Sequence, residues 1–180
     1  TGQICALNTK QVAAIETTDI VALNTAAVRA LNTASVAALT TDQIVAMTST
    51  QIAAMSTAQI SALTTDQVAA IETTDIAAMT TAQIAVLNTA HAVVLSTLQV
   101  GSLNTADMRA FTTADVAVLT TDQIASLNSA QVAAMSSTQV AVLNTSQAAA
   151  IETGYLAGLN SAAIRAFTTA AINALTTDQI

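Results

Sequence analysis

The residues that could perform chemistry are few and stand far apart. His91 is the only histidine and Cys5 is the only cysteine of the 180 residues. Acid–base catalysis by His91 needs a nucleophile or a carboxylate beside it, and a metal site needs further His or Cys ligands. The repeats around His91 supply none of these, so we interpret it as a drifted polar position. We interpret Cys5 as a small hydrophobic side chain, open to an adventitious intermolecular disulfide.

The charged residues recur at fixed places but form no set of ligands. Asp residues of the triplet Thr-Asp-Gln could attract calcium only if several oxygens converged, and Gly-rich ligand loops are missing. The arginines recur with a cassette, and they either pair with acids on adjacent repeats or mark its duplication. We therefore predict no catalytic, cofactor-binding or metal-binding residue, no cofactor and no enzyme. The residues are Asp42, Asp66, Asp122 and Asp178, and Arg29, Arg109 and Arg165.

All of these residues belong to one eight-residue repeat. Cut after every eighth residue, the chain gives 22 octads and a final TDQI, without insertion or deletion of part of an octad. We number the positions of an octad as slots 1 to 8. Slot 1 is Thr or Ser, slot 3 is Gln in 13 of 23 copies, and slots 5 and 6 are mostly Ala. Slots 4 and 7 are apolar, and slot 8 is Asn, Thr or Ser except at Glu16, Glu72 and Glu152.

The octad predicts a short helix followed by a corner. A continuous α-helix would rotate the apolar pair by about 80° with each octad, and a strand would place slots 4 and 7 on opposite faces. Slot 8 followed by Gln or Asp at slot 3 matches a capping box, with slots 7 and 4 as the hydrophobic staple. Such short helices are stable only when stacked. We predict a single all-α solenoid over residues 1–180, with one helix per octad. A β-solenoid is the alternative, because Thr, Val and Ile favour strands.

Charge and hydropathy exclude two classes of partner. The net charge of −7 rests on eleven acids and four cations, so we expect no nucleic-acid binding. No stretch approaches the roughly 20 apolar residues of a membrane-spanning helix, so we expect no membrane insertion. The chain starts at Thr1 without Met, and we expect it to be a segment of a longer protein.

The Thr and Ser residues of slot 1 are the most regular polar feature. A regular screw would array these hydroxyls along one face at constant spacing. Such a face would suit a binding surface for ice or for a protein partner, which is our alternative function. Thr at the start of a helix is also ordinary local chemistry.

Two resemblances follow from the repeat. LTTDQVAAI (63–71) is similar to the opening helix of TAL-effector repeats, although their longer repeat and their basic DNA-binding surface are missing. The whole chain resembles the LTTxQIxAL-type tracts of very large bacterial surface or secreted repeat proteins. That resemblance implies an extracellular or cell-surface rod, spacer or adhesin-like stalk. Open ends and a weakly charged surface further predict self-association into filaments, end to end or laterally.

Overall fold

A computed structural model describes residues 4–180, apart from the side chain of Cys5. Nearly every octad of this part forms one α-helix of four to six residues, and residues 4–180 contain no strand. The all-α prediction is therefore confirmed, and the β-solenoid alternative is wrong. The elements are η1 (Ile4–Ala6), α1 (Thr9–Ala13), α2 (Thr17–Ala22), α3 (Thr25–Ala30), α4 (Thr33–Ala37), α5 (Thr41–Ala46), α6 (Ser49–Ala54), α7 (Thr57–Ser61), α8 (Thr65–Ala70), α9 (Thr73–Ala78), α10 (Thr81–Ile84), α11 (Thr89–Val94), α12 (Thr97–Ser102), α13 (Thr105–Ala110), α14 (Thr113–Val118), α15 (Thr121–Ala125), α16 (Ser129–Ala134), α17 (Ser137–Ala141), α18 (Thr145–Ala150), α19 (Thr153–Leu156), α20 (Ser161–Ala166) and α21 (Thr169–Ala174).

Each helix begins with the predicted cap and ends in two extended residues. At α5 the Gln43 N–H donates to Thr40 Oγ1 at 3.1 Å, and the Thr40 N–H donates to Gln43 Oε1 at 2.8 Å. After Ala46, Met47 is extended (φ −65°, ψ 145°) and its N–H donates to the Ile44 carbonyl. Slot 8 is then extended as the next N-cap, and no residue among the described ones has a positive φ outside glycine. The corner therefore needs neither Gly nor Pro, which explains why the repeat contains almost none.

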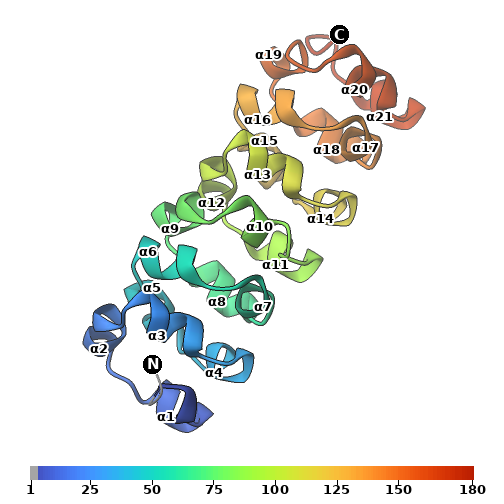
Figure 1. Cartoon of the computed structure of the whole chain (residues 1–180). Coiled ribbons are helices and arrows are strands. Elements are labelled where there is room, and N and C mark those ends of the chain that lie inside the picture. Colours follow the sequence, from blue (N-terminus) through green and yellow to red (C-terminus); the bar gives the residue numbers. More distant parts are fainter. Residues whose placement is uncertain (1–3) are drawn as a thin grey trace. The chain divides into compact units, whose positions relative to one another are not determined.

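The chain divides into two compact units, residues 1–94 (unit 1) and residues 95–180 (unit 2). Within each unit a helix contacts the helix three places later, for example α2 with α5 and α5 with α8 in unit 1, and α14 with α17 in unit 2. Three octads, or 24 residues, therefore make one turn, and Figure 1 shows successive turns of each unit stacked on one another. Each unit is thus an all-α solenoid; one uninterrupted solenoid over residues 1–180 stays a prediction.

This stacking sorts the helices of unit 1 into three columns. We name them the α1 column (α1, α4, α7, α10), the α2 column (α2, α5, α8, α11) and the α3 column (α3, α6, α9). Slots 4 and 7 point inward in every column, and Ile44, Ile52 and Ile60 are fully buried. Each buried aliphatic side chain contributes about 1.5–3 kcal/mol relative to exposure. No helix within residues 4–180 is long and apolar enough to cross a bilayer.

Candidate functional site

The glutamines of slot 3 hold successive turns together. Gln43 uses Oε1 in its capping box, and its Nε2 donates to the carbonyls of Val12 at 2.9 Å and Ile15 at 2.7 Å. These carbonyls belong to slots 4 and 7 at the corner one turn earlier. The side chain therefore satisfies an N-cap N–H and two carbonyls at once, which explains why it can be buried.

The same pattern repeats through both units, and we call it the glutamine ladder. Its members are 1–3% exposed. Sequence reasoning identified their capping role but missed the bonds between turns. The signal was that no Glu occupies slot 3, although Glu also completes a capping box. Only an amide supplies both an acceptor and two donors. The members with both carbonyl bonds are Gln43, Gln51, Gln59, Gln67, Gln83, Gln131, Gln139 and Gln147.

His91 occupies a rung of this ladder. Its Nε2 lies 2.9 Å from the Leu63 carbonyl, and its Nδ1 accepts from the Asn88 N–H at 3.5 Å. The ring makes both contacts when Nε2 carries the proton, so the imidazole copies the donor and acceptor of Gln. This geometry fits the interpretation of His91 as a replaced polar position, because both ring nitrogens are used by the backbone.

Asp75 is a rung that cannot donate. It is 3% exposed; its Oδ1 accepts from Ser49 Oγ at 2.5 Å, and its Oδ2 has no hydrogen-bond partner. Glu72, the N-cap of the same helix α9, makes no side-chain cap bond. The capping box and the amide bonds between turns are therefore both missing here. An ionised carboxylate that lacks a partner in the interior is costly, so Asp75 marks a weak point of unit 1.

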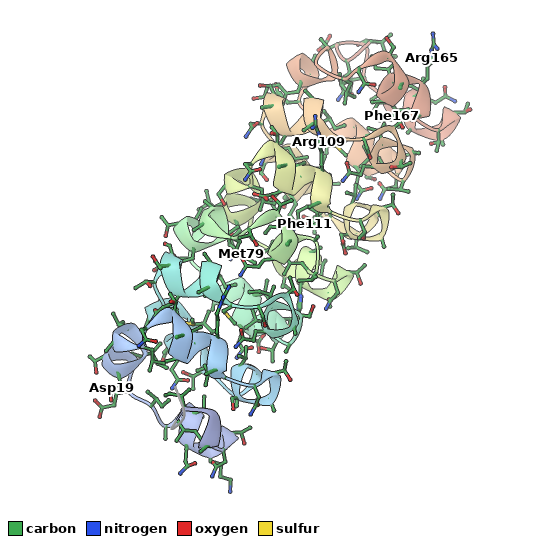
Figure 2. All side chains as sticks on the ribbon, viewed as in Figure 1. Asp19, Met79, Arg109, Phe111, Arg165 and Phe167 are labelled. Carbon is green, nitrogen blue, oxygen red and sulfur yellow. The ribbon has the colours of Figure 1, made fainter. Side chains whose placement is uncertain are left out.

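The arginines of slot 5 bind a backbone carbonyl on the following turn. Arg29 Nε donates to the Ala54 carbonyl at 2.8 Å, and Arg109 Nε donates to the Ala134 carbonyl at 3.2 Å. Figure 2 shows Arg165 projecting away from α20. Arg29 also borders an open groove of about 590 Å³ on the α3 column of unit 1. The groove is lined by Thr25, Ala26, Arg29, Ser49, Thr50, Ala53, Ala54 and Ala78.

The acidic residues of slot 2 lie apart from one another. Asp42, Asp66, Asp122 and Asp178 are exposed. Within residues 4–180, no group of three His, Cys, Asp or Glu side chains could hold a metal ion. The side chain of Cys5 lies outside the described part of the chain.

The slot-1 hydroxyls do not form one face. Successive octads lie on three different columns within each unit, so Thr17 and Thr41 share the α2 column while Thr25 belongs to the α3 column. The expectation of a single hydroxyl face is therefore wrong, because the period of the turn is 24 residues and not eight.

The last turn of unit 2 carries an apolar pocket of about 490 Å³. The final rung of the ladder is Gln179, which donates to the Ile151 carbonyl at 2.7 Å. Within residues 4–180, no later glutamine reaches the carbonyls of Ile164 and Phe167. The pocket is lined by Thr153, Leu156, Ala157, Leu159, Ile164, Phe167, Ile172, Leu175, Asp178, Gln179 and Ile180.

Comparison with known proteins gives one positive finding. A family model described as the ALTTAQ repeat matches five segments, residues 12–49, 44–70, 68–105, 100–137 and 148–180. These segments cover most of the chain and follow its octads. No curated protein and no solved structure matches it.

Proposed function

Because the chain belongs to the ALTTAQ repeat family, we propose that it is a structural repeat module that acts as a rod or spacer of a bacterial surface or secreted protein. A fold made only of short helical repeats is typical of non-enzymatic structural proteins. The extracellular location rests on the resemblance of the octads to tracts of very large surface and secreted proteins.

The observation that carries this proposal is the glutamine ladder. The most frequent polar side chain of the interior spends its acceptor on its own helix cap and its donors on the previous turn, as Gln59 does with Val28 and Leu31. His91, the one residue of a usual catalytic type, is used in the same way. The polar chemistry of the repeat thus serves stacking, and stacking is what a spacer requires.

Self-association end to end belongs to the same proposal. The pocket of the last turn offers apolar side chains together with the carbonyls of Ile164 and Phe167. Gln11 on α1 is exposed, and its Nε2 has no partner within residues 4–180. A turn of octads from a second copy would bring such a glutamine to these carbonyls and repeat the bonds of the interior.

The spacer role is tested by changing the length of unit 1. Inserting three further octads after Thr64 should add one turn, which lengthens the particle by about 8–10 Å, the usual distance between packed helices. Small-angle X-ray scattering measures the maximum dimension. A particle that keeps its length and grows wider would overturn the spacer function. Electron microscopy of the 180-residue chain tests the end-to-end step, because filaments support it and single short particles contradict it.

A further inference from the structure

The α2 column of unit 1 differs from its neighbours in slot 5. Val21, Val45 and Val93 are 48%, 45% and 43% exposed. These are the only valines in slot 5 of the chain, and all three lie on this column. Ala69 occupies the turn between Val45 and Val93, so the column presents a ridge of aliphatic side chains with the 24-residue period. We call Val21, Val45, Ala69 and Val93 the valine ridge.

The exposed acids of the helices of unit 1 gather on the same column. Asp19, Asp42 and Asp66 lie on α2, α5 and α8, and Figure 2 shows Asp19 projecting outward. Asp42 precedes Val45 by three residues, so both side chains lie on one side of α5. The two cations of unit 1, Lys10 and Arg29, lie on the α1 and α3 columns instead.

The α3 column carries the complementary features. Its groove of about 590 Å³ is lined by Ala53, Ala54 and Ala78, which leave room beside their Cβ atoms. Arg29 stands at this groove, held by the bond from its Nε to the Ala54 carbonyl. A guanidinium has five N–H donors, so this bond leaves four for other partners.

We propose that the valine ridge of one copy docks into the Arg29 groove of a second copy, so that units 1 lie side by side. Ridge and groove have the same 24-residue period, because both are built by the same turn, so one fit in register brings successive turns into register. Asp42 and Asp66 then approach Arg29 of the neighbour, whereas a ridge placed on a second ridge would bring carboxylates together. The proposal rests on the structural function above and names the lateral contact of that assembly.

Such a contact joins two different surfaces, so it does not close on itself. A heterologous contact of this kind adds copies in one direction and produces sheets or wide fibres. It therefore makes a prediction that a symmetric contact does not make: two variants, each damaged on a different surface, should still pair with each other.

The experiment uses two variants of the 180-residue chain. The ridge variant is V21Q/V45Q/V93Q, and the groove variant is R29E/A53E; most of these positions are exposed and none belongs to the glutamine ladder. Sedimentation velocity measures the concentration at half association, and electron microscopy measures particle width. We expect wild type to form particles several solenoids wide, and each variant to need at least about tenfold more protein and to stay one solenoid wide. An equimolar mixture should form pairs two solenoids wide and no wider.

A matched control carries the same type of change on another column. A13Q/A37Q/A85Q alters three exposed slot-5 residues of the α1 column and should associate like wild type. The proposal is overturned if wild type stays one solenoid wide, if the mixture does not pair, or if the control loses association as the ridge variant does. Wild-type filaments one solenoid wide would overturn only the lateral contact, because the scattering test of the spacer is independent of it.

Discussion

Gln59 on α7 donates its Nε2 to the carbonyl of Leu31, 28 residues earlier, at 2.8 Å. The same nitrogen reaches the Val28 carbonyl, and the Oε1 of the same side chain accepts from the Ser56 N–H. One amide therefore closes a helix cap and joins two turns. It is the smallest unit of the stacking that makes a solenoid from helices too short to be stable alone.

We predict that Gln59→Glu destabilises unit 1 by about 2–5 kcal/mol. The carboxylate keeps an acceptor for the capping box but turns an oxygen toward the carbonyls of Val28 and Leu31, which leaves buried acceptors without donors. Urea unfolding followed by circular dichroism measures the loss.

Gln11→Glu is the matched control for this substitution. Gln11 forms the same capping box but is exposed, and within residues 4–180 its Nε2 has no carbonyl to lose. We expect a change within about 0.5 kcal/mol, as for ordinary surface positions. Equal losses at the two sites would contradict the role of the ladder.

Asp75→Gln should stabilise unit 1 by about 1–3 kcal/mol. It replaces a buried carboxylate whose Oδ2 has no partner by the amide that neighbouring octads use. By the register of the ladder, its Nε2 would donate to the carbonyls of Ile44 and Met47. The urea midpoint should rise with an unchanged slope. A midpoint that falls would mean that Ser49 and Asp75 form a contact worth more than a rung.

His91 is predicted to act as a rung and nothing else. His91→Gln should leave stability within about 0.5 kcal/mol of wild type or raise it, whereas His91→Leu should cost about 1–3 kcal/mol, because the Leu63 carbonyl and the Asn88 N–H lose their partner. Thermal unfolding of both variants checks the order. If His91→Gln were the more damaging change, the ring would have a role that an amide cannot fill.

Whole octads should be removable, whereas parts of octads should not. Deleting Thr57–Thr64 leaves every later helix with a neighbour three octads back, so helicity and cooperative unfolding should persist. Deleting only Thr57–Ile60 sets a helix start where a corner belongs and should unfold the turns around it. Circular dichroism of the two deletions, compared per residue, distinguishes them. Equal tolerance would show that the octad is not the structural unit.

The cap of each helix was predictable from sequence because it is local. Slot 8 and slot 3 stand three residues apart, so the capping box seen at Thr40 and Gln43 follows from spacing alone. The helical class followed from the alanines of slots 5 and 6, and the stacking followed from the shortness of the helix.

The number of octads per turn was not predictable from the octad itself. It depends on the angle of the corner, which is set by the backbone of two extended residues such as Met47 and Thr48. A hint lay in Val21, Val45 and Val93, whose separations are multiples of 24, but three residues are a small sample. The missing turn number also explains why the hydroxyls of slot 1 were expected on one face.

The most direct test measures which octads are neighbours. Nitroxide labels are placed in pairs at exposed slot-2 positions of unit 1, in a chain whose Cys5 is replaced by alanine. The pairs are Ala34 with Thr50, Ala34 with Ala58 and Ala34 with Asp66, which are 16, 24 and 32 residues apart. Continuous-wave electron paramagnetic resonance should show the strongest dipolar broadening for Ala34 with Ala58, because α4 and α7 are stacked. Strongest broadening in either other pair would contradict three octads per turn, and with it the ladder, the columns and the lateral contact.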